Sequence, residues 1–328
     1  MKRREFITLL GGAGLLCAAK ARRARAQQAA MPVIGYLSHG SPEQTAPLVE
    51  AFRKGLSETG FVEGRNVLIE YRWAHNEPDR LPELAADLVR RQVAVLATPG
   101  TSPIAAKAAT TTIPIVFSTG GDPVEAGLVA SLNRPGGNAT GISYMNVELS
   151  AKRLGLLHEL LPGAARFGVL IDPANPSSQS ILTDLRASAS AIDRHIEAFT
   201  AGNNRDIDRA FAALAQKRSD GLLISPMPLF YNRRVQILTL AARHAVPVVY
   251  PAREWAEAGG LMSYGSSYTD QHRQAGIYTG RILRGEKAAD LPILRATRFE
   301  FVINLQTAKS LGIDIPTTLL ARADEVIE

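Results

Sequence analysis

The sequence of 328 residues contains a single cysteine, Cys17. A chain with one cysteine forms no internal disulfide and no cysteine-based zinc site, so its stability must come from packing of a core. Aromatic residues make up only 6% of the sequence, whereas hydrophobic residues make up 46%. This composition indicates a globular protein, and the length suits two domains of ordinary size.

Motifs that carry common enzyme chemistry are missing as well. The six histidines are scattered without metal-ligand spacing, and the sequence has no HExxH, GxSxG or Walker A motif and no GxGxxG after its first predicted strand. The glycine-rich residues 11–14 lie in a predicted export signal rather than after a strand. We therefore expect no catalytic residue, no metal site and no cofactor, and an exported enzyme is the least favoured function.

Excess positive charge is confined to the N-terminus. Seven of the 37 basic residues and one of the 31 acidic residues fall within residues 1–26, so the rest of the chain is formally neutral. The pI near 9.5 therefore gives no support to nucleic-acid binding. We expect no nucleic acid among the partners.

Residues 1–26 have the pattern of an export signal. A basic segment with the pair Arg3-Arg4 precedes an apolar run at 7–19, which is shorter than the ~20 apolar residues of a membrane-spanning helix. Ala24 and Ala26 are small residues at the positions that a signal peptidase reads. The twin arginine resembles a Tat signal, which predicts export by the Tat translocase, cleavage after Ala26 and a periplasmic location.

Two alternatives to a cleaved Tat signal stay open. One is a short membrane anchor that is never removed, and the other is a lipoprotein signal that is acylated on Cys17. Leu15 and Leu16 precede this cysteine where a lipoprotein signal has small residues. The pattern therefore favours a cysteine that is discarded with the signal.

After the signal, short apolar runs alternate with longer amphipathic stretches, and the same order occurs twice. The first half predicts strands at 33–37, 67–73, 93–98 and 115–118 and helices at 46–59, 81–91 and 102–110. The second half predicts strands at 167–171, 195–200, 221–225 and 248–250 and helices at 177–191, 207–217 and 235–244. Strands that alternate with helices indicate parallel sheets covered on both faces. The expected fold is α/β, with two similar doubly wound lobes.

Several crossings between the lobes are expected. A strand-like segment at 140–144 ends near Met145, a helix at 269–283 follows a second crossing near 263–266, and a strand at 299–303 with a helix at 305–311 completes the chain. Lobe 1 is predicted to contain 27–144 plus about 266–295, and lobe 2 to contain 145–265 plus about 296–328. Several hinge strands between two lobes make a molecule that can close like a jaw.

Four segments are similar to a known family. They are DPVEAGLVASLNRPGGNATG at 122–141, FRKGL at 52–56, GFVEG at 60–64 and AKSLGIDIP at 308–316. With them, the chain resembles the tryptophan/tyrosine-type substrate-binding proteins of ABC transporters over essentially its whole length after residue 26. The resemblance implies a type I periplasmic-binding fold and a transport role, with an ABC permease in the inner membrane as partner.

The function expected from these features is capture of a small-molecule solute by a monomeric receptor. A carboxylate-bearing solute is predicted, in the class of aromatic or branched amino acids and aromatic acids. A periplasmic sensor that reports the same solute to a membrane receptor is the alternative. Composition and motifs do not separate import from sensing, whereas a neighbouring permease gene or kinase gene would.

Candidate ligand-binding residues follow from the rule that open parallel sheets bind ligands beyond the carboxyl ends of their strands. The loops selected in this way are rich in hydroxyl groups, glycine and proline, and hydroxyls beside free N–H groups at helix starts suit a carboxylate. The candidates are Ser38, Thr98, Gly100, Thr101, Ser102, Ser118, Thr119, Gly121, Asp122, Tyr144, Asp172, Asn175, Ser225, Met227, Tyr250 and Tyr264.

Two of these candidates also have a purely structural interpretation. Ser102 and Asp122 each precede a predicted helix, and Pro123 is a favoured first helical residue. Each could therefore be a helix cap, which contributes ~1 kcal/mol and touches no ligand. The functional interpretation gives Asp122 the role of receiving a ligand ammonium group.

Tyrosines are candidates to stack on the ring of an aromatic solute. Tyr144 and Tyr264 stand at the predicted crossings, where the floor of the cleft is expected, and Tyr231 is a further candidate. Tyr36 and Tyr250 are candidates as well, although Tyr36 lies inside a strand, which favours a place in the core.

Overall fold

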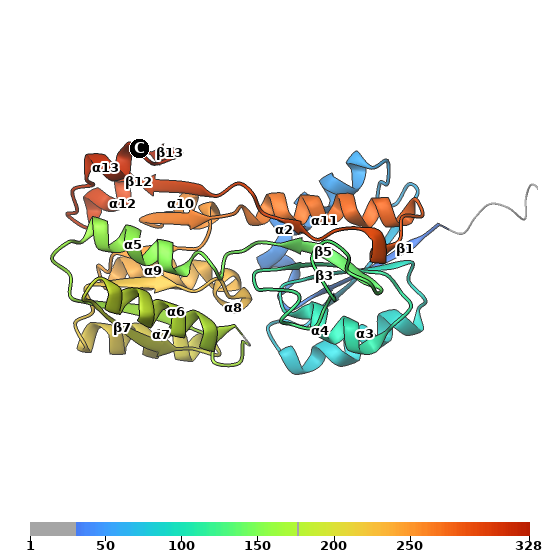
Figure 1. The fold of residues 1–328 in the computed structure, drawn as a ribbon, viewed down its shortest axis with the longest axis horizontal. Coiled ribbons are helices and arrows are strands. Elements are labelled where there is room, and N and C mark those ends of the chain that lie inside the picture. Colours follow the sequence, from blue (N-terminus) through green and yellow to red (C-terminus); the bar gives the residue numbers. More distant parts are fainter. Residues whose placement is uncertain (1–30, 176) are drawn as a thin grey trace, which may run out of the picture.

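The computed structural model describes residues 31–175 and 177–328. These residues form two lobes side by side, each built on one sheet (Figure 1). The predicted signal, residues 1–26 with Cys17, lies outside the described residues. Within the described part of the chain, no helix has the length and apolarity needed to cross a membrane.

The first sheet has six strands in the order β11-β5-β4-β3-β1-β2, and every neighbouring pair is parallel. The strands are β1 (Val33–Ser38), β2 (Leu68–Trp73), β3 (Val95–Pro99), β4 (Ile115–Thr119), β5 (Ala139–Ser143) and β11 (Leu294–Arg295). Along β1, Ile34 and Tyr36 face one buried cluster, whereas Leu37 faces the other. The apolar run of β1 therefore fits a strand that is covered on both faces.

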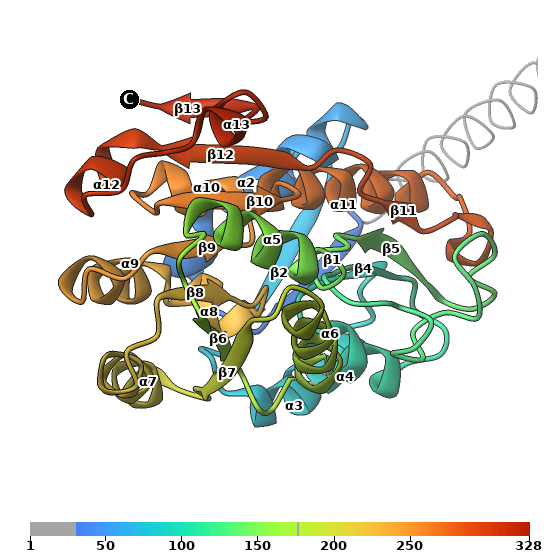
Figure 2. The same cartoon turned by 60° about the vertical axis from the view of Figure 1, so that its left-hand side comes forward.

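The second sheet has seven strands in the order β13-β12-β10-β9-β8-β6-β7, which can be followed from top to bottom in Figure 2. The strands are β6 (Arg166–Ile171), β7 (His195–Thr200), β8 (Gly221–Ile224), β9 (Val248–Tyr250), β10 (Met262–Gly265), β12 (Glu300–Asn304) and β13 (Glu325–Ile327). The order β7-β6-β8-β9-β10 repeats the order β2-β1-β3-β4-β5 of the first sheet. Only the pair β10–β12 is antiparallel in this sheet, because the chain enters β12 directly from the first lobe.

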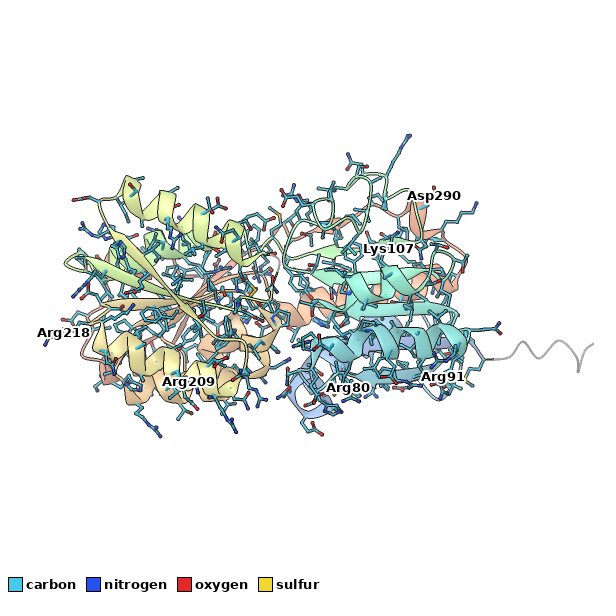
Figure 3. All side chains as sticks on the ribbon, turned by 90° about the horizontal axis from the view of Figure 1, so that it is seen from below. Arg80, Arg91, Lys107, Arg209, Arg218 and Asp290 are labelled. Carbon is cyan, nitrogen blue, oxygen red and sulfur yellow. The ribbon has the colours of Figure 1, made fainter. Side chains whose placement is uncertain are left out.

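Helices cover both faces of each sheet (Figure 1). Those of the first lobe are α2 (Pro42–Glu58), α3 (Leu81–Arg90), α4 (Ser102–Ala109) and α11 (Tyr268–Leu283). Those of the second lobe are α5 (Ser150–Leu160), α6 (Ser178–Ala191), α7 (Asn204–Gln216), α8 (Pro228–Asn232), α9 (Arg234–Arg243), α10 (Arg253–Glu257), α12 (Leu305–Ser310) and α13 (Thr317–Leu320). The exposed charged residues labelled in Figure 3, such as Arg80 and Arg209, lie on the outside of the lobes.

The predicted fold class, two doubly wound lobes joined by several crossings, is confirmed. The chain leaves the first sheet after β5, returns after β10 and leaves again between β11 and β12. The sequence did not predict the helices α5, α8, α10 and α13, and a crossing was expected where β10 forms. It also expected a helix after Asp122, but residues 123–127 form turns.

Candidate functional site

A cavity of about 340 Å³ lies between the two lobes. Its lining includes residues that follow β1 and β3 in the first sheet and β6 and β8 in the second. In each sheet the strand order reverses between these two strands. Ligands bind in open α/β sheets at such switch points, and here the switch points of both lobes face the same cavity.

The first lobe supplies four loops and parts of three helices to the cavity. The lining residues from this lobe are Tyr36, Ser38, His39, Gly40, Thr45, Leu48, Pro99, Gly100, Thr101, Pro103, Ile104, Thr119, Gly120, Gly121, Asp122, Glu125, Ala126, Leu128, Tyr144, Tyr268 and His272. Three of the glycines face the other lobe closely, and a Cβ at Gly40 would lie 2.9 Å from Asn232 Nδ2. A Cβ at Gly100 would lie 3.2 Å from Pro228 Cγ, and one at Gly121 would lie 3.0 Å from Ser177 Oγ. These glycines therefore let the lobes come together.

The second lobe supplies two loops, the start of α6, the short helix α8 and the crossing after β5. Its lining residues are Val147, Asn175, Ser177, Ser180, Pro226, Met227, Pro228, Tyr231 and Asn232. Asn175 Oδ1 accepts a hydrogen bond from the Ser177 backbone N–H at 3.0 Å, which fixes the loop after β6. Pro228 occupies the start of α8, where its missing N–H costs nothing.

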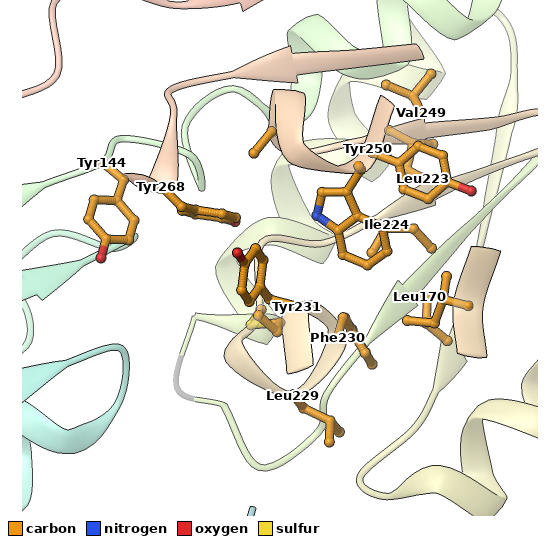
Figure 4. Packing of buried hydrophobic residues seen from close by; sticks show 14 of the residues in the cluster. Tyr144, Leu170, Leu223, Ile224, Leu229, Phe230, Tyr231, Val249, Tyr250 and Tyr268 are labelled. Atoms are coloured by element: carbon orange, nitrogen blue, oxygen red, sulfur yellow. The ribbon is translucent and has the colours of Figure 1, made fainter. Parts of the chain in front are cut away.

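Four tyrosines and a histidine form one wall of the cavity, which we call the aromatic wall: Tyr36, Tyr144, Tyr231, Tyr268 and His272. The Tyr144 and Tyr268 ring centroids are 5.6 Å apart, and those of Tyr231 and Tyr268 are 5.0 Å apart with the rings edge to face. Figure 4 shows Tyr144, Tyr268 and Tyr231 following one another beside the core of the second lobe. The wall offers ring faces and edges to a flat apolar group.

Several buried polar atoms of the first lobe have no hydrogen-bond partner among the described residues. In the lining they are the hydroxyls of Tyr36, Thr101 and Tyr144 and the Nδ1 atom of His39. An unsatisfied buried polar group costs about 1–3 kcal/mol. A bound molecule that supplied the missing partners would recover part of that free energy.

Another part of the lining, the loop after β4, carries negative charge. Asp122 Oδ1 accepts hydrogen bonds from the backbone N–H groups of Val124 and Glu125, at 2.7 and 3.4 Å. Its second carboxylate oxygen is left for another partner, and Glu125 lines the cavity close by. The described lining contains no lysine or arginine, so this side of the cavity, which we call the acidic side, favours a cationic group.

The two histidines of the lining are both neutral at physiological pH. Burial lowers the pKa of His39 and lowers that of His272 to about 4. His272 Nδ1 lies 2.8 Å from the backbone carbonyl oxygen of Tyr268. A carbonyl oxygen only accepts, so in the neutral ring the proton is on Nδ1 and Nε2 is unprotonated.

The crossings beneath the cavity are held together by a buried arginine. Arg153, which is 1% exposed, donates from Nε to the Tyr264 carbonyl at 2.8 Å and from Nη2 to the Asn146 carbonyl at 2.7 Å. Burial without a carboxylate partner lowers the pKa of Arg153 to about 10. Asn146 Oδ1 accepts in turn from the Ser266 N–H at 3.1 Å. These contacts join the crossing after β5 to the one after β10.

The structure brings only part of the predicted site together. The candidates that line the cavity are Ser38, Gly100, Thr101, Thr119, Gly121, Asp122, Tyr144, Asn175 and Met227. Thr98, Ser102 and Ser118 lie behind the lining and are nearly fully buried. Ser102 is the first residue of α4, and its hydroxyl caps nothing among the described residues.

The remaining candidates of the second half lie outside the lining, because each is engaged elsewhere. Ser225 Oγ donates to the Leu170 carbonyl at 2.6 Å, and Asp172 Oδ1 accepts from the Ala174 N–H at 3.0 Å. Tyr250 stacks on the buried Trp255 at a centroid distance of 4.9 Å. Tyr264 packs against Phe299 and Phe301 instead of reaching the cavity.

Sequence reasoning missed Tyr268 and His272, and for Tyr36 it favoured the core over contact with a solute. Tyr36 is 1% exposed but also lines the cavity, so both descriptions apply to it. Tyr268 and His272 are on α11, which belongs to the first lobe although it follows strands of the second. Their spacing of four residues at the start of a helix places them on one face, which was the available signal.

The chain is similar to proteins of one family over nearly all of the described residues. Residues 31–327 match the family model described as ABC transporter substrate binding protein. Over 274 residues the chain is 27% identical to a "Tyrosine-binding protein" of Clostridioides difficile (strain R20291), which covers 80% of this chain and 76% of that one.

Solved structures share the fold. A conserved domain protein from Vibrio cholerae O1 biovar eltor str. N16961 matches with a TM-score of 0.83 at 28% identity, over 90% of this chain and 100% of that one. An ABC domain in complex with L-Trp from Streptococcus pneumonia matches with a TM-score of 0.82 at 24% identity, over 91% and 100%. These likenesses confirm the expected type I periplasmic-binding fold.

Proposed function

The chain belongs to the ABC transporter substrate-binding protein family, and from this premise we propose that it captures an amino acid with an aromatic side chain for an ABC importer. The solute would bind in the cavity between the lobes. Membership of the family makes the chain a solute-binding protein, whereas the aromatic amino acid and the direction of transport are the proposed part.

The observation that carries the proposal is the division of the cavity into two chemically different sides. The aromatic wall suits a ring, and the acidic side suits an ammonium group because Asp122 and Glu125 face no lysine or arginine in the described lining. A cavity of about 340 Å³ is small among ligand pockets, which span about 300–1,000 Å³. A single amino acid fits this size and this distribution of chemistry.

The carboxylate of such a solute has a natural partner at the start of α4. Thr101 precedes this helix, and the N–H groups of a first helical turn have no partner within the helix. The Thr101 hydroxyl is unpartnered among the described residues and lines the cavity. A helix start combined with a free hydroxyl binds a carboxylate without a basic side chain.

The comparisons support the same solute class. The Clostridioides difficile relative is described as tyrosine-binding, and the same fold holds L-Trp in the Streptococcus structure. The proposal narrows the earlier expectation, because branched amino acids would leave the aromatic wall without a ring to stack on.

Closure of the lobes and delivery to the permease complete the proposed function. The lobes would be 27–144 with about 266–295 and 145–265 with about 296–328, and they would close over the solute by bending at the crossings. Export through the Tat translocase by residues 1–26 would place the monomeric receptor in the periplasm, where it meets an ABC permease in the inner membrane.

A thermal-shift screen tests the solute class. Because a ligand that binds only the folded state stabilises it by mass action, L-tyrosine or L-tryptophan in large excess should raise the melting temperature of the purified protein. L-Leucine, L-lysine and L-glutamate are the controls and should raise it less. A shift with a control solute but none with any aromatic amino acid would contradict the proposal.

A further inference from the structure

The Nε2 atom of His272 is a hydrogen-bond acceptor without a donor at the aromatic wall. Nδ1 is committed to the Tyr268 carbonyl at 2.8 Å, and Nε2 makes no hydrogen bond to any described residue. The side chain is 4% exposed and lines the cavity. The one open hydrogen-bonding position of this imidazole therefore belongs to whatever fills the cavity.

The chemistry of this position is fixed rather than adaptable. With the proton held on Nδ1 by a carbonyl that only accepts, Nε2 presents a lone pair. Burial lowers the pKa of His272 to about 4, so the ring does not gain a second proton at physiological pH. The position accepts a hydrogen bond and does not donate one.

The neighbouring groups of the wall do not satisfy Nε2. The Tyr144 ring centroid lies 6.4 Å from that of the imidazole, yet the Tyr144 hydroxyl has no hydrogen-bond partner among the described residues. The Tyr268 ring lies between Tyr144 and Tyr231, at 5.6 and 5.0 Å from them. A solute ring that rests on this wall meets aromatic rings, the unpartnered hydroxyls of Tyr36 and Tyr144 and the acceptor nitrogen of His272.

We propose that His272 accepts a hydrogen bond from an O–H or N–H on the ring of the solute and so selects phenol- and indole-bearing amino acids over L-phenylalanine. The proposal rests on the proposed function, because it assumes that an aromatic amino acid occupies the cavity. L-Phenylalanine fills the same space but leaves Nε2 without a donor, and a site built around a hydrogen bond rejects the analogue that lacks it.

Wild-type protein tests the proposal through a series of solutes. L-Tyrosine and L-tryptophan should bind at least ~10-fold more tightly than L-phenylalanine by isothermal titration calorimetry, as one buried hydrogen bond of this kind is worth about a factor of ten. O-Methyl-L-tyrosine and 1-methyl-L-tryptophan, which lack the donor but are larger, should also bind at least ~10-fold more weakly. Weaker binding of both the smaller and the larger analogues identifies the hydrogen bond rather than the fit as the cause.

Two variants of His272 separate the effect of its hydrogen-bond acceptor from the effect of its side-chain volume. His272→Phe removes the acceptor, so the ratio of the L-tyrosine and L-phenylalanine affinities should fall to near one while L-phenylalanine binding is kept. His272→Gln places an amide oxygen near the position of Nε2 and should restore part of the preference. His195→Gln, an exposed histidine on β7 far from the cavity, is the matched control and should leave the ratio unchanged.

The outcomes distinguish this inference from the proposed function. If aromatic amino acids bind but the ratio is the same in wild type and His272→Phe, the inference is wrong and the proposed function stands. Should neither variant fold, equal affinities of wild type for L-tyrosine and O-methyl-L-tyrosine would overturn the inference by themselves. If no aromatic amino acid binds to wild type, the proposed function fails first.

Discussion

Asp122 shows at the scale of one residue how a side chain that holds a local turn can also line the cavity. One carboxylate oxygen holds the turn at Val124 and Glu125, and the other makes no hydrogen bond to a described residue. The sequence allowed two roles for Asp122, a cap and a ligand contact. Oδ1 serves the cap, so a ligand contact would fall to Oδ2. The cap closes a turn rather than a helix.

Two substitutions of Asp122 separate these roles. Asp122→Asn keeps an oxygen for the turn but removes the charge, so we expect affinity for an aromatic amino acid to fall about 10-fold or more with little change in melting temperature. Asp122→Ala removes both and should lower affinity and stability together. Asp314→Asn, an exposed acid outside the cavity, is the control, and calorimetry with thermal melts supplies both measurements. Unchanged affinity in Asp122→Asn would show that Asp122 does not bind the ammonium group of the solute.

His272 makes a second prediction, on stability as a function of pH. Its pKa is about 4 in the folded protein and 6.5 as the ordinary value, so between these values the unfolded chain binds more protons. Stability should therefore fall as the pH drops from 6.5 toward 4, by up to about 3 kcal/mol from this group. His39, whose pKa is also lowered by burial, acts in the same direction.

Urea unfolding at several pH values measures this effect. The wild-type curve should slope more steeply between pH 6.5 and 5 than that of His272→Gln, which does not titrate. Parallel curves for the two proteins would show that His272 is not buried in the neutral form.

The sequence predicted residues in loops better than residues that reach the cavity from helices or strand interiors. Asp122, Thr101 and Asn175 follow strands, so a rule about strand ends finds them. Tyr268 and His272 are supplied by a helix whose place in the first lobe depends on a crossing that no local pattern specifies. Tyr264 packs on the second lobe because the strand β10 forms where a crossing was expected.

At the scale of elements, the close packing of α11 on α2 positions the aromatic wall. A Cβ on Gly276 would lie 2.1 Å from the Phe52 carbonyl oxygen, and one on Gly55 would lie 1.8 Å from that of Arg273. Arg273 also bonds Glu58 through two nitrogens at 2.8 and 2.9 Å. Glycine at both contact points lets the helix that carries His272 lie against the first lobe.

Gly276→Ala should force the two helices apart. The new methyl group meets backbone atoms, which cannot rotate away, so we expect the free energy of unfolding to fall by about 1–3 kcal/mol. Gly155→Ala is a matched control on α5, where a Cβ meets nothing within 4 Å, and it should stabilise by about 0.5–1 kcal/mol through helix propensity. Denaturant unfolding compares them, and equal effects would contradict the close packing.

Most of the longer elements could be predicted because their patterns are long, whereas the 11-residue helix α5 was missed. The helices at α6, α7 and α9 and the central strands lie within a few residues of their expected positions. The short helices α8 and α10, of five residues each, were missed, since five residues carry too little periodicity to stand out. Both begin at a proline-containing loop, and α8 brings Tyr231 and Asn232 to the cavity.

At the scale of the whole molecule, a polar bridge crosses the mouth of the cleft. Asn232 Nδ2 in the second lobe donates to Asn76 Oδ1 in the first at 2.7 Å, and Asn76 Nδ2 donates to Gln44 Oε1 at 3.0 Å. Asn76 has a φ of 66°, a conformation that asparagine and glycine tolerate best. The bridge can form only when the lobes are close together.

Asn76→Gly should lower the affinity for every solute by the same factor. Glycine keeps the backbone conformation but removes both side-chain hydrogen bonds of Asn76. Only the bond with Asn232 joins the lobes, so the closed state loses one contact between them and apparent affinities should fall about 2- to 10-fold without a change in selectivity. His75→Gly is the matched control, because His75 also has a positive φ and its side chain makes no hydrogen bond to a described residue. Calorimetry gives the affinities, and a selective loss of one solute would contradict a role in closure.

The central claim is that this cavity binds an aromatic amino acid between two lobes. Isothermal titration calorimetry of the purified protein with L-tyrosine and with L-tryptophan tests it most directly. The expected result is binding of one solute per chain, weakened about 10-fold or more in Asp122→Asn. An absence of binding by L-tyrosine, L-tryptophan and L-phenylalanine, with a protein that melts cooperatively, would contradict the claim.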